Sequence, residues 1–157
     1  MRLLFLAIFS LAMAFVESAV VVYLRALFYP HGMTDVRVVF PRPFYATEVY
    51  REAATIVMLI SVALLSAKKS WWDRLAYFLW CFGIWDIFYY FWLFVLVAWP
   101  PSLFTEDVLF LIPVPWIAPV IVPVVISCAM ILGALLILSM KTMSLRDGLW
   151  QEARRDG

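Results

Sequence analysis

Four long apolar runs constrain the fold of this chain more than any other feature of its sequence. They cover residues 3–28, 49–67, 75–98 and 116–140. A helix that crosses a bilayer needs about 20 mostly apolar residues, and all four runs are close to or above this length. Because 66% of the 157 residues are hydrophobic, a water-soluble fold of this size would leave much apolar surface exposed. The sequence therefore predicts an all-α integral membrane protein, in which four transmembrane helices form a bundle and residues 1–157 form a single domain.

The positive charges between the runs predict how the bundle is oriented, since Lys and Arg concentrate in cytoplasmic loops. Eight lie on one side of the predicted bundle and four on the other. The first set is Arg2, Lys68, Lys69, Arg74, Lys141, Arg146, Arg154 and Arg155, and the second is Arg25, Arg37, Arg42 and Arg51. We therefore expect both termini on the cytoplasmic side (N-in/C-in), in the cytoplasmic (inner) membrane of a bacterium or archaeon.

The stretch between the third and fourth runs differs from an ordinary loop. Pro100 and Pro101 end the third helix, and Thr105 then starts a short apolar segment that ends near Ile112. Its capping pattern predicts a helix that is too short to cross the membrane. Because the segment is too apolar for free solvent, we expect it to be interfacial or re-entrant, on the outer side.

Sequence signals also predict the start of the second helix and the structure of the tail. Thr47 is expected to be the N-cap of the second helix. The tail, residues 141–157, places apolar side chains on one side with basic residues around them. This pattern predicts a cytoplasmic amphipathic helix on the anionic inner leaflet.

Proline recurs every fourth residue near the start of the fourth run, at Pro115, Pro119 and Pro123. Proline inside a helix removes an N–H donor and leaves the carbonyl one turn earlier without its partner. We therefore expect the outer half of the fourth helix to be kinked or partly unwound. Its free carbonyls would either pack against neighbouring helices or line a cavity.

Asp86 lies near the middle of the third run, where an unpaired charge costs at least about 2.5–3.5 kcal/mol. It shares one helical face with Gly83 and Tyr90, and Tyr89 lies to one side of it. A carboxylate at this depth needs a group that neutralises or binds it. The rest of the sequence is therefore expected to supply a partner for Asp86.

The first and second runs each carry a polar stripe that can meet Asp86. Glu17 lies on the small-residue face of the first helix, with Arg25 two turns further along. Counting about 1.5 Å per residue places Glu17 and Asp86 within roughly 5 Å of each other in height. Arg51 and Glu52 on the second helix join Arg25 in a second layer near the outer boundary.

Acidic side chains outnumber basic ones across these two layers. The acids are Glu17, Glu48, Glu52 and Asp86, and the bases are Arg25 and Arg51. One carboxylate of the deep layer is therefore expected to be protonated or to share a bound cation. Two structural explanations stay open. Arg25 with Glu52, and Arg51 with Glu48, would be ordinary ion pairs, and the deep acids would be protonated groups that only fix the helix register.

Several kinds of chemistry lack the residues they need. His31 is the only histidine and lies in an outer loop, so haem ligation and histidine-rich zinc sites lack ligands. Cys81 and Cys128 are expected to be buried thiols at different depths. The sequence has no hydrolase motif and no phosphate-binding glycine loop, and no basic tail or patch of a kind that suggests nucleic-acid binding. We therefore expect no metal site, no cofactor and no nucleic-acid partner, and the sequence favours a role other than catalysis.

The buried acids favour transport or permeation linked to a proton or a small cation. The candidate site consists of Glu17, Asp86, Tyr89, Tyr90, Arg25, Arg51 and Glu52. In this interpretation Glu17 and Asp86 take and release the ion. Two alternatives stay open: an accessory subunit of a larger membrane complex, and an intramembrane enzyme that uses the two acids on a lipid or isoprenoid. The expected partners are the lipid bilayer and either other membrane subunits or further copies of this chain.

Overall fold

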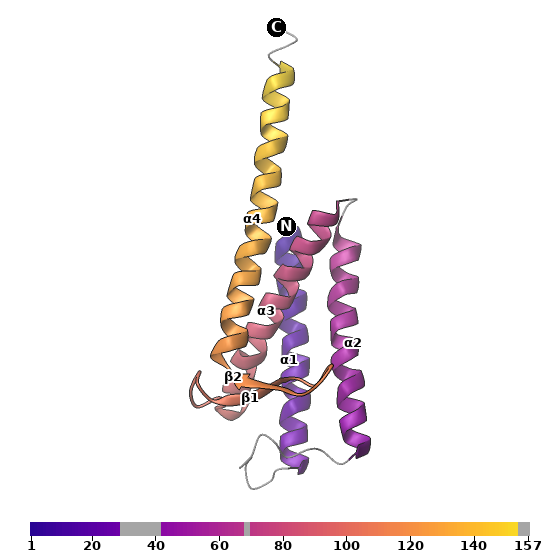
Figure 1. The fold of residues 1–157 in the computed structure, drawn as a ribbon, viewed down its shortest axis with the longest axis vertical. Helices are drawn as coiled ribbons and strands as arrows, with labels where there is room; N and C mark the ends of the chain where they lie inside the picture. The colour runs from indigo at the N-terminus through magenta and orange to yellow at the C-terminus, as the bar shows by residue number, and fades with distance from the viewer. Residues whose placement is uncertain (29–41, 68–69, 154–157) are drawn as a thin grey trace.

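In the residues that it describes, the computed structural model contains four long helices and one β-hairpin (Figure 1). The elements are α1 (Arg2–Phe28), α2 (Arg42–Ser66), α3 (Trp71–Val97), β1 (Glu106–Phe110), β2 (Trp116–Pro119) and α4 (Ile121–Ala153). The structure describes residues 1–28, 42–67 and 70–153. Each of the four helices contains a segment long and apolar enough to cross a membrane. The predicted helical bundle with four candidate membrane spans is thus confirmed.

The helix α3 lies at the centre of this bundle. It packs extensively against α1 and against α4, and less extensively against α2, whereas α1 and α2 have few contacts with each other. Two indole N–H groups of α3 donate hydrogen bonds to backbone carbonyls of α1, from Trp80 to Leu3 at 3.0 Å and from Trp92 to Leu11 at 3.2 Å. The apolar core therefore forms around α3, and α2 is the helix least tied to it.

Gly83 lets α3 and α4 approach each other closely. A Cβ atom at this position would lie 2.7 Å from the carbonyl oxygen of Ser127 on α4. Small residues at helix interfaces allow backbones to pack in this way inside membranes. The close contact lies one turn from Asp86 and brings that carboxylate against α4.

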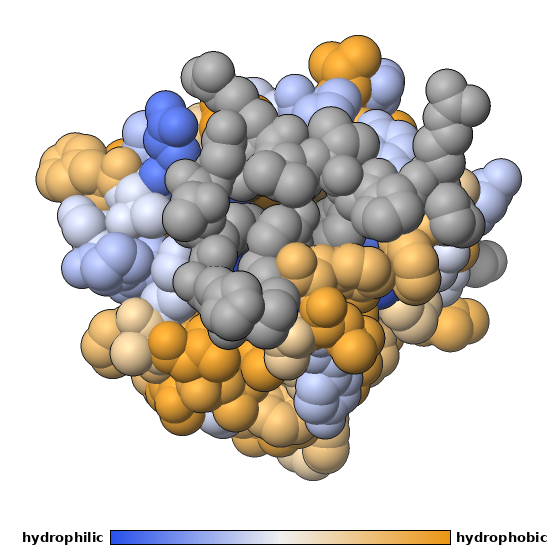
Figure 2. Space-filling view, turned by 90° about the horizontal axis from the view of Figure 1, so that it is seen from below, coloured by the Kyte–Doolittle hydropathy of each residue, from blue (hydrophilic) through white to orange (hydrophobic). Residues whose placement is uncertain are grey.

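The outward faces of the helices are apolar. Large exposed hydrophobic side chains occur on all four, among them Leu4, Val57, Phe94 and Leu132. Figure 2 views the molecule from the end at which α3 ends and α4 begins, which we call the hairpin end, and shows apolar residues over much of the described surface. Extensive exposed apolar surface of this kind fits contact with lipid chains.

Two predicted helix ends are wrong. The helix α2 begins at Arg42, so Thr47 lies inside it and is not its N-cap. Proline is tolerated in a first helical turn, which is why Pro43 does not delay the start. The helix α4 continues to Ala153, so the predicted tail helix is an extension of the fourth helix as far as this residue.

Predictions that lie outside the described residues concern His31, Arg37, Lys68, Lys69, Arg154 and Arg155.

The segment before α4 is a β-hairpin and not the predicted short helix. The strands β1 and β2 pair antiparallel, with Asp107 opposite Ala118 and Val108 opposite Ile117. Short apolar runs are compatible with either a helix or a strand. The strand pairing prevails because it gives both segments backbone hydrogen-bond partners, and the proline-containing stretch 111–115 supplies the turn between them.

The predicted kink in the fourth helix is also wrong, because α4 begins after two of the three prolines. Pro115 lies in the hairpin turn, and Pro119 is the last residue of β2. Pro123 lies in the first turn of α4, where a backbone N–H group has no intrahelical partner to lose. The three prolines therefore shape the hairpin and the start of α4 and do not interrupt the helix.

Candidate functional site

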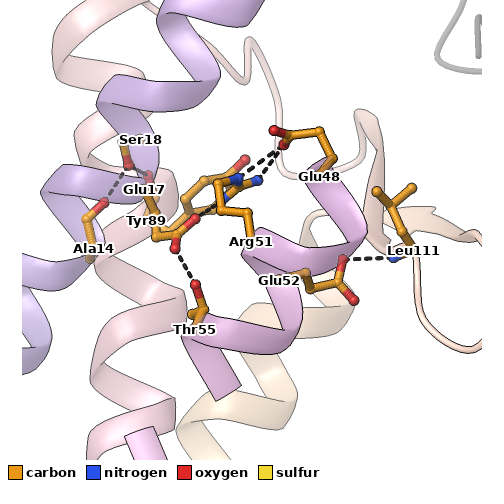
Figure 3. A network of polar contacts seen from close by, with 9 residues as sticks. All are labelled: Ala14, Glu17, Ser18, Glu48, Arg51, Glu52, Thr55, Tyr89 and Leu111. Carbon is orange, nitrogen blue, oxygen red and sulfur yellow. Dashed lines mark hydrogen bonds and ion pairs between the residues drawn. The ribbon is translucent and has the colours of Figure 1, made fainter. Parts of the chain in front are cut away.

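Arg51 on α2 joins two buried carboxylates (Figure 3). It forms an ion pair with Glu17 of α1, and its Nε and Nη2 atoms donate hydrogen bonds to Glu48 at 3.0 and 2.7 Å. Thr55, one turn further along α2, donates a hydrogen bond to Glu17. Glu17 and Glu48 are each only 6% exposed. Residues three and four apart share a helix face, so the spacing of Glu48, Arg51 and Thr55 places all three in one group.

Glu52, also on α2, holds the hairpin. Its two carboxylate oxygens accept hydrogen bonds from the backbone N–H groups of Leu111 at 2.8 Å and Ile112 at 3.1 Å, and Figure 3 shows the first of these. Glu52 and Arg25, both described residues, form no ion pair with each other, contrary to one structural explanation offered above. The other pair of that explanation, between Arg51 and Glu48, is present.

Asp86 is paired with α4 and not with Glu17. The Ser127 hydroxyl donates a hydrogen bond to one oxygen of Asp86 at 2.7 Å. Both side chains are buried, Asp86 at 7% and Ser127 at 0% exposure. The two acids were placed at similar depth by counting residues along their helices, but they have different partners. Glu17 is bound by residues of α2, and Asp86 is bound by a residue of α4.

Tyr90 contacts the hairpin, and the ring of Tyr89 packs against the ring of Tyr90, with 5.0 Å between the ring centres. The Tyr90 hydroxyl donates a hydrogen bond to Asp107 of β1 at 3.2 Å. The Ser18 hydroxyl donates a hydrogen bond to the backbone carbonyl of Tyr89 at 2.9 Å, which fixes α1 against α3. The charged groups within electrostatic range of the Tyr89 hydroxyl are Arg25, Arg51, Asp86 and Asp107. Charges from both the Arg51 side and the Asp86 side thus act on Tyr89, although no hydrogen bond given for the described residues joins the two sides.

Asp107 is a buried acid that the sequence pattern did not single out as a site residue. It is only 6% exposed, and it accepts the hydrogen bond from Tyr90. Burial raises the pKa of Asp107 to about 6, although the nearby Arg25 charge and the Tyr90 hydrogen bond act to lower it. The only sequence signal is an acidic residue at the start of an apolar segment. Its burial depends on the hairpin, which the sequence did not predict.

Arg25 lies on an aromatic ring at the hairpin end. Its guanidinium carbon is 3.9 Å from the centre of the Trp99 ring, which is a cation–π contact. Ala98 caps α3 in the left-handed conformation with φ of 53°, and the N–H group of Ala98 donates to the Phe94 carbonyl. This turn brings Trp99 against the last turn of α1, where Arg25 lies.

The network as a whole contains more acids than bases. Its acids are Glu17, Glu48, Glu52, Asp86 and Asp107, and its bases are Arg25 and Arg51. In the described part of the chain, no group of three or more His, Cys, Asp or Glu side chains is arranged to hold a metal ion. An excess of buried carboxylates of this kind is suited to holding and exchanging protons.

The two cysteines lie outside this network and are both free thiols. Cys81 is buried in the core, as expected from the sequence. Cys128 is exposed, against the prediction, because it lies on the outward face of α4, next in sequence to the buried Ser127.

The chain matches no protein-family model, no curated protein and no solved structure in the comparisons made with each. Its functional interpretation therefore rests on the geometry and charge of this network.

Proposed function

We propose that the protein moves a proton, or a small cation, across the membrane through the network that contains Glu17, Arg51 and Asp86. The observation that carries the proposal is the excess of carboxylates over arginines in this network, with Glu17, Glu48 and Asp86 each at most 7% exposed. A buried carboxylate without a compensating charge is stabilised when it takes up a proton or binds a cation. The charge of the network therefore depends on the supply of protons from either side.

Arg51 is the switching group in this proposal. It is shared between Glu17 and Glu48, which approach different edges of its guanidinium. When Glu17 takes up a proton, its attraction for Arg51 falls and Arg51 stays with Glu48. When the proton leaves, the pair with Glu17 forms again. Thr55 orients Glu17 in both states, because a hydroxyl can donate to a carboxylate and to the carbonyl oxygen of a carboxylic acid alike.

Asp86 is the second proton-binding group, and Ser127 holds it in place. The tyrosine hydroxyls near Asp86 extend the polar path towards Asp107 on the hairpin. We place the hairpin on the outer side as the interfacial or re-entrant segment, with both termini inside. The distribution of Lys and Arg in the sequence supports this orientation, in the cytoplasmic (inner) membrane of a bacterium or archaeon.

The test is proton flux in liposomes that contain the purified protein and a trapped pH-sensitive dye. A potassium gradient with valinomycin supplies the driving force, and sodium or potassium gradients replace it to test for a cation. We expect flux from the wild type, and we expect Glu17→Gln and Asp86→Asn to reduce it to the rate of empty liposomes. Glu106→Gln is the control, because Glu106 is an exposed acid of β1 outside the network.

Two results would refute the proposal. One is a wild type that passes neither protons nor cations faster than empty liposomes. The other is flux that both variants retain at the wild-type rate, because proton exchange at Glu17 and Asp86 would then be unnecessary. The thermal unfolding midpoint of each variant, measured in the same detergent, separates loss of flux from loss of fold.

A second candidate is an accessory subunit of a larger membrane complex. The observation in its favour is that α4 packs mainly against α3 and leaves large apolar side chains such as Val125, Leu132 and Leu136 exposed. A partner helix would cover such a face as well as lipid does. Native electrophoresis after extraction in a mild detergent tests this candidate: a subunit is expected to migrate with other chains, and migration of the chain alone would count against it.

A further inference from the structure

Arg25 differs from the other arginine of the network because it has no ion pair with any carboxylate among the described residues. Three N–H···O contacts or ion pairs tie Arg51 to glutamates. Among the described residues, no hydrogen bond or ion pair involves the Arg25 guanidinium. Its guanidinium carbon instead lies over the face of Trp99, 3.9 Å from the ring centre. Within the part of the chain that the structure describes, the N–H donors of Arg25 are thus available to a further group.

The contact with Trp99 prepares Arg25 for such a group. An arginine that rests against a ring with its face keeps the edge of its guanidinium free, and this edge carries N–H donors in a fork that matches a carboxylate or a phosphate. Trp99 is itself held by the turn at Ala98 and by the ring of Tyr90, whose centre lies 6.3 Å away. Because both the arginine and its support are fixed, little side-chain freedom would be lost on binding.

The charges around Arg25 determine when an anion can bind there. The titratable and charged groups that act on the neighbouring Asp107 are Arg25 from α1 and Tyr90 and Asp86 from α3, and Asp107 in turn acts on Tyr89. With Asp107 ionised, Arg25 already faces a negative charge. An anion therefore enters most easily when Asp107 carries a proton, since a protonated acid neither repels the anion nor competes for Arg25. Proton uptake by Asp107 and anion binding at Arg25 would therefore be linked.

We propose that Arg25 binds the carboxylate or phosphate group of a small anion or lipid headgroup, and that Asp107 takes up a proton with it. This proposal deepens the proposed function. Its transport part, in which the bound anion moves together with the proton, rests on that function. The site itself needs only the geometry of Arg25, Trp99 and Asp107.

Binding is tested by isothermal titration calorimetry on the purified full-length chain in a neutral detergent. The probes are inorganic phosphate, acetate and short-chain phosphatidylglycerol, with short-chain phosphatidylcholine as the uncharged-headgroup comparison. We expect at least one anionic probe to bind the wild type at pH 6, and the affinity to fall up to about tenfold for each unit of rising pH if one proton is taken up with the anion. Binding of the soluble anions supports a small-anion substrate, and binding of phosphatidylglycerol alone supports a lipid headgroup.

Matched variants assign the binding to this site. Arg25→Gln is expected to abolish it, and Arg25→Lys to weaken it by about tenfold or more because the bidentate fork is lost. Arg74→Gln is the control, because Arg74 is an exposed arginine in the first turns of α3, at the other end of that helix from Trp99. Asp107→Asn is expected to keep anion binding and to remove its pH dependence. Thermal unfolding midpoints check that each variant is folded.

The proposal is overturned if no anionic probe binds the wild type at pH 6, or if folded Arg25→Gln binds as the wild type does. It is also overturned if Arg74→Gln weakens binding as much as Arg25→Gln does, because the binding would then be non-specific. Proton flux without anion binding leaves the proposed function standing and removes this site. Anion binding without any flux keeps the site and refutes the proposed function.

Discussion

Replacing Gly83 with alanine tests how closely α3 and α4 must approach each other beside Asp86. The new Cβ atom would lie 2.7 Å from the Ser127 carbonyl oxygen and 2.8 Å from Cγ1 of Ile131. Ordinary van der Waals contact begins at 3.4 Å. The Ile131 side chain can rotate away, but the Ser127 carbonyl belongs to the backbone of α4. The two helices must therefore move apart by several tenths of an ångström.

The cost of this movement can be separated from the effect of glycine on helix stability. Overpacking of a close interface costs about 1–3 kcal/mol, whereas glycine to alanine inside a helix gains about 0.5–1 kcal/mol. Gly133 of α4 provides the matched control, because a Cβ atom there would lie 3.8 Å from Leu79, at an ordinary contact distance. The propensity gain cancels between the two variants. We therefore expect Gly83→Ala to be less stable than Gly133→Ala by about 1–3 kcal/mol.

The measurement is the free energy of unfolding of both variants and the wild type in the same detergent, from denaturant titrations followed by tryptophan fluorescence. Because Ser127 also donates its hydroxyl to Asp86 at 2.7 Å, the displaced α4 should weaken that hydrogen bond too. Gly83→Ala is thus expected to lower proton flux as well as stability. Equal stability of Gly83→Ala and Gly133→Ala would refute the close packing of α3 on α4 described above.

Three further predictions concern single side chains. The pKa of Asp107 is raised to about 6 from 3.8, so between these pH values the folded state holds a proton that the unfolded state has lost. The free energy of unfolding should therefore fall by up to about 3 kcal/mol as the pH rises from about 4 through 6. Asp107→Asn should remove this dependence, and an unchanged pH profile in the variant would contradict the prediction. Trp80 donates its indole N–H to a carbonyl of α1 at 3.0 Å, whereas the buried indole N–H of Trp85 has no partner among the described residues. Trp80→Phe should therefore destabilise the fold by about 1–3 kcal/mol more than Trp85→Phe does, as measured by chemical unfolding. The ammonium nitrogen of Lys141 lies 2.6 Å from both carboxylate oxygens of Asp73, which is 6% exposed. Lys141→Gln should therefore lower the free energy of unfolding by about 1–3 kcal/mol. Adding Asp73→Asn should recover part of this loss, and a double variant no more stable than Lys141→Gln would argue against the pair.

The sequence predicted the helices better than it predicted their partners. Apolar length alone identifies the four candidate spans, and polar stripes correctly indicated that Glu17 and Asp86 are buried. Height along a helix does not say which neighbour lies opposite a side chain, since that depends on how the helices are ordered around α3. Glu17 therefore has Arg51 as its partner, and Asp86 has Ser127, although their positions suggested that they would meet.

The hairpin was missed for a different physical reason. The segment 103–119 is apolar, short and rich in proline, so its local pattern suits a helix turn and a strand equally well. Only the pairing of two strands, which is a non-local interaction, decides between them. The burial of Asp107 follows from that pairing, so it could not be predicted before the hairpin was known.

The way in which α2 is attached to the molecule has a mechanical consequence. Nearer its C-terminal end, Leu59 and Ala63 lie in the apolar core. Nearer the hairpin end, apart from a ring contact between Phe28 and Phe44, the attachments described here are Arg51 with Glu17 and Glu52 with the hairpin turn. The helix α2 is thus held by apolar packing near its C-terminal end and by an ion pair and hydrogen bonds near the hairpin end. Protonation of Glu17 or Glu52 would weaken only the attachments near the hairpin end, so we expect a fall in pH to loosen that end of α2 while its C-terminal end stays packed.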